Sequence, residues 1–482
     1  MKPSDTVIES RLGGIRTANR STHGHAAVGA PEIRPSSPPY ILEDKTEAAA
    51  RMPGWSAPKD EKQAAGAPAV TPEHRPRTVA ELGIRRAIIE DLTMKSLYLC
   101  GALSMRDLGA QMHVSVNVAD EIVARLRTDQ LCQVTGMAGN MLTVVLTEQG
   151  RKRAIEVLAQ GQYTGAAPVS LENYVAQVKK QSVRKMVVRK ADVERAFRDL
   201  VMDTRVLGQI GTGLNSGASI FVHGPAGVGK TLIAETMSKV LAQDNVWVPH
   251  AVEVDGQIIT VYDPMIHKRV SGPETENCDD RWVRCERPSV LVGGELTIEM
   301  LDLQYNHAAK FYSGPVQMKA NNGVLILDDF GRQRVRPEEL LNRWVVPLDR
   351  GIDFLSMAGG RKIEIPFEML VVFSTNMDPA DLVDAAFLRR MQTKIRVDSA
   401  TNDQFRRIFY AVADRRSLAV DDETIDELIV TIRERLKQEL RACQPRDLVN
   451  QVCWAAQYEG REPILDRESL MTAVENYFLA KP

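Results

Sequence analysis

The stretch "SIFVHGPAGVGKTLIAETMSKVL", Ser219–Leu241, combines a short apolar run, a glycine-rich loop and an amphipathic segment. Its loop fits the pattern GxxxxGK[ST], with a predicted strand before it and a predicted helix after it. Glycines at these positions let backbone N–H groups surround phosphate oxygens at the N-terminus of a helix. The stretch therefore predicts an α/β fold that binds a nucleotide through a P-loop.

Eight consecutive residues form the predicted phosphate loop. Lys230 is expected to neutralise the β- and γ-phosphate oxygens, and the Thr231 hydroxyl is expected to hold Mg²⁺. The predicted nucleotide-binding residues of this loop are Gly224, Pro225, Ala226, Gly227, Val228, Gly229, Lys230 and Thr231.

A second apolar run, "VLILDDFG", Val324–Gly331, ends in two aspartates. Asp328 at the carboxyl end of this predicted strand is expected to bind Mg²⁺ through water, and Asp329 is expected to face the γ-phosphate as a general base. Aspartate is one methylene shorter than the glutamate that usually follows such a run, and a base must come within about 3 Å of the water it polarises. We therefore expect slow hydrolysis.

Further polar residues follow the third predicted strand, "EMLVVFSTN". Asn376 at its end can orient the attacking water, or it can simply cap the loop that follows. Arg389 and Arg390 in "DAAFLRRM" are predicted near the rim of the domain, where a neighbouring subunit could be touched. Arg446 in "QPRDLVNQV" is predicted in the first turn of a C-terminal helix.

The order and spacing of these motifs resemble those of the AAA+ ATPases over residues 193–482. Within them, "KFYSGPVQMKANNGVLILDDF" is similar to the MoxR-related group, and the whole chain looks like bacterial proteins described as predicted AAA family ATPases with chaperone activity. The resemblance implies a P-loop core with a parallel sheet flanked by helices, followed by a helical lid. It also implies ATP and Mg²⁺ at the interfaces of a homo-oligomeric ring, commonly a hexamer. The implied roles are Walker A for 224–231, Walker B for 324–329, sensor 1 for Asn376, arginine fingers for Arg389 and Arg390, and sensor 2 for Arg446.

Composition and periodicity divide the chain into five parts. The first part holds ten of the 24 prolines and no periodic apolar pattern, which predicts disorder. The second combines two helical patterns, a hairpin near Gly139-Asn140 and a closing helix, which is typical of a winged-helix domain. The predicted parts are 1–77 disordered, 78–160 winged-helix-like, 161–192 a basic helical linker, 193–395 the α/β nucleotide-binding domain, and 396–482 a helical lid.

The winged-helix-like part carries nine Lys/Arg and nine Asp/Glu residues. A domain that reads DNA needs a basic surface, because phosphate neutralisation supplies most of its affinity. Asp120 and Glu121 also lie where a recognition helix would meet the bases. Docking to a protein is therefore favoured, although "KKQSVRKMVVRK", Lys179–Lys190, remains a possible nucleic-acid patch.

The segment between the first two strands is long and contains "AVEVDGQIITVYD", which predicts a hairpin at Asp255-Gly256. This hairpin can line a ring pore or pack at the edge of a sheet. The aromatic residues Tyr305, Phe311 and Tyr312 raise the same choice between a pore loop and a hydrophobic core, and the core is favoured.

The bulk properties are those of an ordinary cytoplasmic protein. The chain has 482 residues, a net charge of −2 and six cysteines without paired spacing, which predicts reduced thiols. Cys278 and Cys285 with His267 and His307 match no usual zinc spacing. No signal peptide and no membrane-spanning stretch is expected.

Three hypotheses follow from the sequence. The first is an ATPase that remodels an unidentified protein client. The second is a DNA-associated ATPase or a regulator of transcription or replication that uses the winged helix and the basic segment. The third is a switch that binds ATP and barely hydrolyses it.

Overall fold

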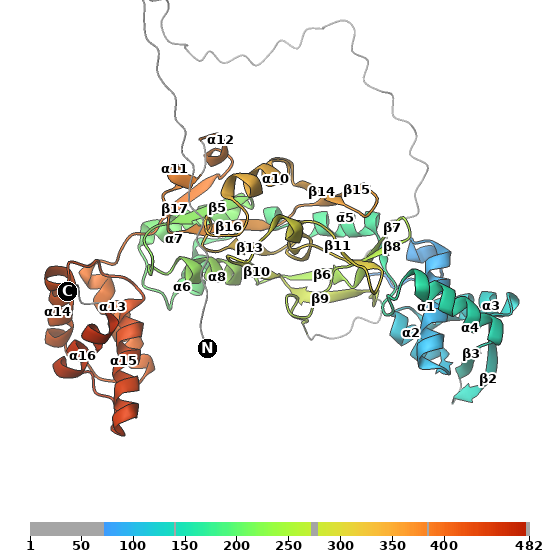
Figure 1. The fold of residues 1–482 in the computed structure, drawn as a ribbon, viewed down its shortest axis with the longest axis horizontal. Helices are drawn as coiled ribbons and strands as arrows, with labels where there is room; N and C mark the ends of the chain where they lie inside the picture. The colour runs from blue at the N-terminus through green and yellow to red at the C-terminus, as the bar shows by residue number, and fades with distance from the viewer. Residues whose placement is uncertain (1–71, 139–140, 271–277, 383–384, 479–482) are drawn as a thin grey trace, which may run out of the picture. The chain divides into compact units, whose positions relative to one another are not determined.

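The computed structural model describes residues 72–138, 141–270, 278–382 and 385–478 (Figure 1). Residues 1–71 of the segment predicted to be disordered, 1–77, lie outside the described residues. The predicted turn at Gly139-Asn140 also lies outside them. No helix in these described ranges is long and apolar enough to cross a membrane.

A five-stranded parallel sheet forms the centre of the fold, in the order β10-β13-β16-β5-β17. Each adjacent pair is parallel, which confirms the predicted α/β class. The three central strands, β13, β16 and β5, are mostly or wholly buried, as expected where helices cover both faces of a sheet. The strands are β5 Ser219–His223, β10 Ser289–Val292, β13 Val324–Leu327, β16 Leu370–Thr375 and β17 Thr393–Arg396.

Helices cover the two faces of this sheet, and alternating strand residues point to opposite faces. Ile220 and Val222 pack in one core with residues of α6, α7 and α8, whereas Phe221 packs in another core with Trp344 of α10. Figure 1 shows α8 and α10 on opposite sides of the strands. The helices are α6 Lys190–Phe197, α7 Thr204–Ser216, α8 Lys230–Leu241 and α10 Pro337–Arg350.

A second, mixed sheet has the order β11-β12-β8-β7-β4 and is built mostly from the long segment between β5 and β13. The predicted hairpin is confirmed: β7 pairs antiparallel with β8, and Asp255 and Gly256 both have positive φ, 51° and 85°. Tyr312 is buried, as the core interpretation predicted. The strands are β4 Val169–Ser170, β7 Ala251–Val254, β8 Gln257–Thr260, β11 Gln304–Asn306 and β12 Phe311–Ser313.

Two antiparallel ladders accompany these sheets: β6 Asn245–Pro249 with β9 Trp282–Glu286, and β14 Ile352–Ser356 with β15 Lys362–Pro366. The short helical elements are η1 Ala80–Leu82, η2 Val183–Lys185, η3 Ile298–Leu301, α9 Val316–Lys319, α11 Pro379–Leu382 and α12 Ala385–Leu388.

The segment 161–192, predicted as a basic helical linker, is integrated into the fold. It contains α5 Leu171–Lys180, and its strand β4 pairs with β7. The buried Asn322, just before β13, donates to the Val178 carbonyl at 2.8 Å and accepts from Gln181 Nε2 at 2.8 Å. These contacts attach α5 to the start of β13, so the segment differs from a free linker.

The N-terminal described part contains the two predicted helices, the predicted hairpin strands and the predicted closing helix in that order, preceded by a further helix, α1, and a short strand, β1. Its core joins residues of α1, α2, α3 and the β2–β3 hairpin. The winged-helix assignment itself stays a prediction. The elements are α1 Arg86–Cys100, β1 Leu103–Ser104, α2 Met105–Met112, α3 Val116–Thr128, β2 Cys132–Ala138, β3 Met141–Leu146 and α4 Glu148–Gln160.

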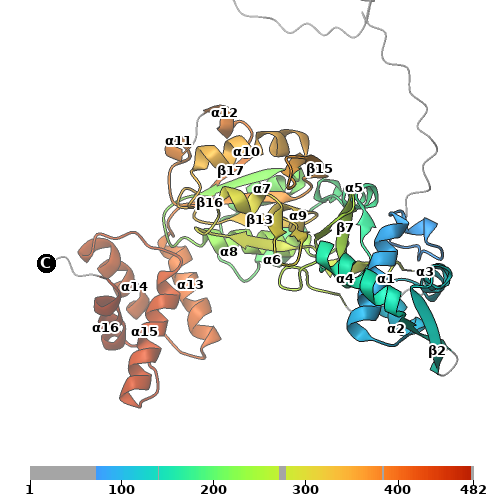
Figure 2. The same ribbon diagram turned by 45° about the vertical axis from the view of Figure 1, so that its right-hand side comes forward.

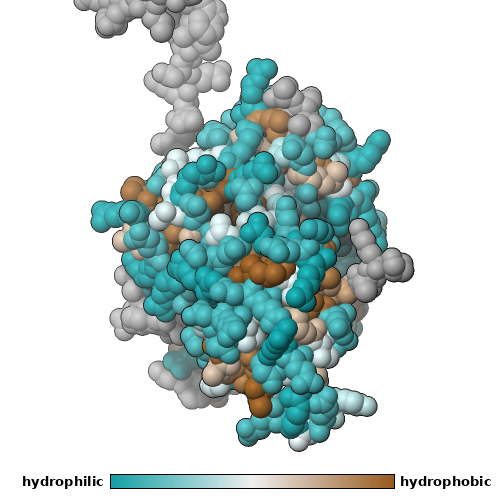
Figure 3. Space-filling view, turned by 90° about the vertical axis from the view of Figure 1, so that its left-hand side faces the viewer, coloured by the Kyte–Doolittle hydropathy of each residue, from teal (hydrophilic) through white to brown (hydrophobic). Residues whose placement is uncertain are grey.

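The C-terminal part is a bundle of helices with its own core, which includes Phe405, Phe409 and Leu448 (Figure 2). Figure 3 shows the face that lies on the left-hand side in Figure 1. This face is mostly hydrophilic, with hydrophobic residues in small separate groups. The helices are α13 Asn402–Arg415, α14 Asp422–Val430, a π-helical turn η4 Thr431–Arg435, α15 Gln444–Glu459 and α16 Arg467–Tyr477.

Candidate nucleotide site

The phosphate loop joins the carboxyl end of β5 to the first residue of α8 and requires glycine at particular positions. Gly224 has φ 149°, and a Cβ there would lie 2.0 Å from the Val397 carbonyl oxygen. Gly227 has φ 81°, and a Cβ there would lie 2.7 Å from Cys443 Sγ. The backbone path of the loop is therefore open only to glycine at both positions.

The loop presents backbone donors that the protein does not use. Among the described residues, the N–H groups of Ala226, Gly227, Val228 and Gly229 donate to no other protein group. They precede the N-terminus of α8, where the helix dipole favours an anion. This arrangement fits a phosphate group.

Lys230 is the first residue of α8 and is 6% exposed. Its ammonium group donates to the carbonyl oxygens of Gly224 at 3.0 Å and Pro225 at 2.7 Å, and to Asn376 Oδ1 at 2.5 Å. Burial lowers the pKa of Lys230, and the nearby Asp329 and Asp328 oppose that shift. The lysine is thus held at the loop as a desolvated cation that can turn to phosphate oxygens.

Thr231 and Asp328 meet although 97 residues separate them in the chain. The Thr231 hydroxyl donates to Asp328 Oδ2 at 2.8 Å, because β13 ends beside the start of α8. A hydroxyl and a carboxylate are oxygen ligands of the kind that Mg²⁺ prefers. The two side chains therefore fit the predicted magnesium site.

Asp329 has a left-handed backbone conformation, φ 48°, and an exposed side chain. Its Oδ1 accepts a hydrogen bond from Asn376 Nδ2 at 2.9 Å, and Asn376 Oδ1 accepts from Lys230. Aspartate tolerates this conformation better than most residues. The structure thus brings Lys230, Asn376 and Asp329 into one hydrogen-bonded chain at the carboxyl edge of the sheet.

Arg389 and Arg390 lie at the amino ends of the strands of the sheet, whereas this chain's own phosphate loop lies at their carboxyl ends. They precede β17, whose first residue Thr393 pairs with Ile220 at the start of β5, and the Ser219 hydroxyl donates to the Arg390 carbonyl at 3.2 Å. Four strand residues span about 13 Å. The two arginines therefore do not join the residues described above within one copy of the chain.

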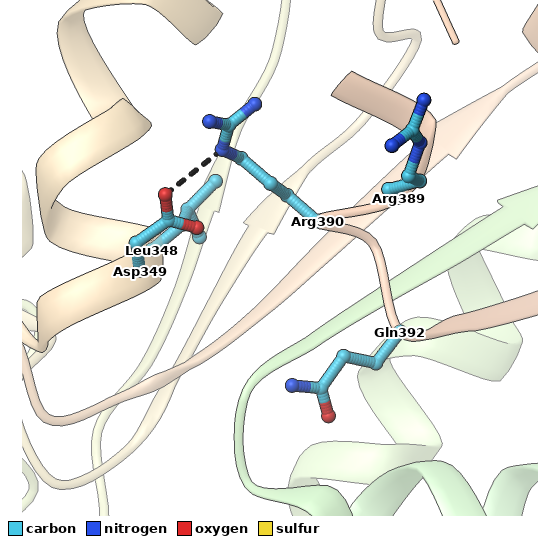
Figure 4. Close-up of a pocket in the computed structure, with 5 residues that line it drawn as sticks. All are labelled: Leu348, Asp349, Arg389, Arg390 and Gln392. Atoms are coloured by element: carbon cyan, nitrogen blue, oxygen red, sulfur yellow. Dashed lines mark hydrogen bonds and ion pairs between the residues drawn. The ribbon is translucent and has the colours of Figure 1, made fainter. Parts of the chain in front are cut away.

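The two arginines also differ from each other. Arg390 Nε donates to Asp349 of α10 at 2.9 Å, and its guanidinium lies 5.6 Å from the centre of the Phe387 ring. Arg389 is exposed, and no ion pair or hydrogen bond of its side chain is found within the described ranges. Figure 4 shows Arg390 directed at Asp349 and Arg389 directed elsewhere; Gln392 completes the lining of this surface hollow of about 420 Å³.

Arg446 lies in the first turn of α15, as predicted, but its side chain is 67% exposed and pairs with Asp447 at 2.9 Å. Arg441 and Cys443, which the sequence analysis did not single out, lie closer to the phosphate loop. A Cβ on Gly227 would be 3.3 Å from Arg441 Cδ, and the Cys443 N–H donates to the Gly227 carbonyl at 3.0 Å.

The Arg441 guanidinium adds an orphaned donor to the loop. Its Nε is buried and has no hydrogen-bond partner among the described residues. A phosphate on the loop is an acceptor of the kind this donor lacks. The sequence signal that could have indicated Arg441 is its place just before the predicted helix that contains Arg446.

Among the described residues, no group of three His, Cys, Asp or Glu side chains is arranged to hold a metal. His267 Nδ1 accepts from the Asp263 N–H at 2.9 Å, and its Nε2 lies 2.9 Å from the Lys319 carbonyl. Burial raises the pKa of Cys285 to about 12.

Comparisons with known proteins give limited matches. Residues 401–476 match a family described as "Domain of unknown function (DUF8689)". No curated protein matches the chain.

The chain is similar to several solved structures of low sequence identity. NtrX from Brucella abortus in complex with ADP is 13% identical, with 70% of this chain and 68% of that chain covered and a TM-score of 0.36. The RuvB Holliday junction branch migration motor from Thermotoga maritima is 15% identical, with 64% and 72% covered and a TM-score of 0.31. Domain III of the replication initiation protein DnaA from Thermotoga maritima is 11% identical, with 60% and 98% covered and a TM-score of 0.34. At these TM-scores, the interpretation of this chain's function rests on its own residues.

Proposed function

We propose that this chain is a P-loop ATPase of the AAA+ type that hydrolyses ATP slowly, in an oligomer, to remodel a protein partner. The observation that carries the proposal is the meeting of five predicted residues from three strand ends at one edge of the sheet: Lys230, Thr231, Asp328, Asp329 and Asn376. Such a group of residues can hold a nucleoside triphosphate and position a water molecule beside it.

Each side chain then has a defined task. The loop N–H groups and Lys230 bind the phosphates, and Thr231 with Asp328 would hold Mg²⁺, which neutralises phosphate charge when bound. Asn376 orients Asp329, and Asp329 accepts a proton from the attacking water. The short side chain of Asp329 supports slow turnover.

The positions of the arginines support an oligomer. Charge that develops on the γ-phosphate is stabilised by a positioned cation. Because Arg389 lies at the edge of the sheet away from its own phosphate loop, it can serve only the nucleotide of a second copy of the chain. A ring is the arrangement in which every copy does so.

The pairing of basic residues supports a protein partner over a nucleic acid. Glu121 of α3 accepts from the Val79 N–H and from Arg86, both at 2.8 Å, so the N-terminal segment occupies part of the predicted recognition helix. In the basic segment 179–190, three of the six cations pair with carboxylates. These ion pairs are Lys180–Glu73, Arg184–Glu368 and Lys190–Glu194.

The proposal is tested by nucleotide binding and phosphate release. Lys230→Ala is expected to weaken ATP binding about 10- to 100-fold, because a charged hydrogen-bond donor to the phosphates is lost. Lys239→Ala changes an exposed lysine of the same helix and is the matched control. Fluorescent ATP titration and a phosphate-release assay with and without Mg²⁺ measure the two steps.

The outcomes separate the hypotheses. Magnesium-dependent phosphate release that disappears in Lys230→Ala supports the ATPase. Tight ATP binding without release indicates a nucleotide switch instead, and wild-type protein that binds no ATP contradicts the proposal.

Arg441 and Arg446 give a second prediction at this site. Arg441→Ala is expected to weaken ATP binding about tenfold, because its buried Nε is available to a phosphate, whereas Arg446→Ala changes binding less than about twofold, since Arg446 is already paired with Asp447. The same fluorescence titration compares the two variants. Unchanged binding in Arg441→Ala would remove the role assigned to Arg441, and a tenfold loss in Arg446→Ala would contradict the prediction that Arg446 stays paired with Asp447.

A further inference from the structure

The segment Gly331–Arg336, "GRQRVR", connects β13 to α10 and is called the arginine loop below (Figure 1). Arg332, Arg334 and Arg336 are all exposed, whereas Gln333 is half-buried and Val335 is buried. As far as the described residues go, none of the three guanidinium groups has an ion pair or a hydrogen bond. Three neighbouring cations therefore face solvent without compensation.

Backbone and side-chain contacts hold this loop in shape. The Arg334 N–H donates to the Gly294 carbonyl at 3.2 Å, and the Val335 N–H donates to the Leu296 carbonyl at 3.3 Å. Exposed side chains alternate with more buried ones along the loop. The loop thus presents a short row of arginines on a fixed backbone.

Elsewhere the fold gives many of its arginines a carboxylate. Arg281 pairs with Asp279 in the interior, and Arg343 pairs with the buried Asp353. Uncompensated like charges that lie together repel one another, and an anionic ligand removes this repulsion. The arginine loop is therefore a candidate anion-binding surface.

The surroundings of the loop favour an acidic peptide over a nucleic acid. Asp329, Glu338 and Glu339 are exposed on either side of the arginines. A nucleic-acid strand carries a charge at every nucleotide and would meet these carboxylates, whereas a peptide can place its charges only opposite the arginines. Carboxylates also fit the guanidinium group through two parallel hydrogen bonds.

The apolar neighbour of the loop agrees with a peptide. Strands of unpaired nucleic acid bind by stacking bases on aromatic side chains. Next to Gly331 lies Met377, which is 39% exposed, and a Cβ on Gly331 would be 3.1 Å from its sulfur. A flexible thioether suits the varied side chains of a polypeptide.

We propose that the arginine loop docks an acidic, extended segment of a protein partner. The loop is also connected to the nucleotide site: Gln333 Nε2 donates to the Asp328 carbonyl at 2.8 Å, and Gln333 Oε1 accepts from the Gly331 N–H at 2.8 Å. A peptide bound at the loop would therefore affect the position of Asp328 through the Gln333 side-chain amide. This consequence rests on the proposed function. Peptide binding itself is expected in the absence of ATP, because the three arginines are exposed without it.

The experiment measures binding of a labelled synthetic peptide to the full chain without nucleotide, by fluorescence anisotropy at several salt concentrations. The probe carries glutamate at alternate positions, separated by serine, and a glutamine–serine peptide of the same length is the control ligand. Replacing Arg332, Arg334 and Arg336 together by glutamine is expected to weaken binding at least about tenfold, because three charge-assisted pairs are lost.

A matched control variant replaces Arg106, Arg205 and Arg407 by glutamine; these are exposed and have no ion pair within the described part of the chain. Salt-sensitive binding that only the first triple variant loses supports the proposal. Wild-type protein that binds no peptide overturns it, as does equal loss in both triple variants. Tighter binding of an oligothymidylate, lost in the first variant, also overturns it and assigns the loop to nucleic acid. Because no ATP is present, failure here is separate from failure of the ATPase proposal.

Discussion

Asp329→Asn is expected to keep ATP binding and to lower the rate of phosphate release at least about 100-fold. Asparagine accepts the same hydrogen bond from Asn376 Nδ2 through its oxygen, so the geometry of the site is kept. It cannot take a proton from water, however, and general bases contribute about 10²- to 10⁴-fold to such rates. Steady-state phosphate release beside fluorescent ATP titration measures both quantities.

Asp329→Glu is a second variant that tests the length of the side chain at this position. Glutamate keeps a base and extends it by one methylene, so measurable turnover is expected. Its backbone would have to adopt the left-handed φ of 48°, which aspartate tolerates better than glutamate. This conformation gives a physical reason for aspartate at the position. Unchanged turnover in Asp329→Asn would rule out Asp329 as the base.

Arg389→Ala is expected to lower ATP hydrolysis about 10³-fold while leaving ATP binding by a single copy unchanged. An arginine supplied to the γ-phosphate is worth about 10³- to 10⁵-fold in related phosphoryl transfers. Arg389 is the exposed member of the pair, whereas Arg390 is held by Asp349 within its own chain. Phosphate release at a protein concentration that supports assembly measures the effect, and Arg205→Ala is an exposed control.

Mixing variants tests whether Arg389 acts on a second copy. Arg389→Ala has an intact phosphate loop, and Lys230→Ala has an intact Arg389. Each alone is expected to be nearly inactive, and their mixture is expected to recover part of the activity where a Lys230→Ala copy presents its arginine to an Arg389→Ala copy. A mixture as inactive as its components, in assemblies shown to contain both, would contradict action between copies.

Local patterns were sufficient for the centre of the fold. The phosphate loop, the buried strands and the hairpin at Asp255-Gly256 depend on residues close in the chain, where glycine spacing and alternation act directly. The integration of segment 161–192 was missed because β4 pairs with a strand more than 80 residues away, and its charges gave no sign of this. The ion pairs of that segment with Glu73 and Glu368 likewise join distant residues.

The sequence by itself determined that this protein has a parallel α/β core with a phosphate loop and two aspartates at a strand end, because each of these is specified by a short run of residues. Only the tertiary structure decided which polar groups lack a partner among the described residues; these groups include the loop N–H groups, Arg441 Nε and the three cations of the arginine loop. The physical reason is that a charge or a donor is compensated by whatever the fold places within about 3 Å of it, and those neighbours come from remote parts of the chain.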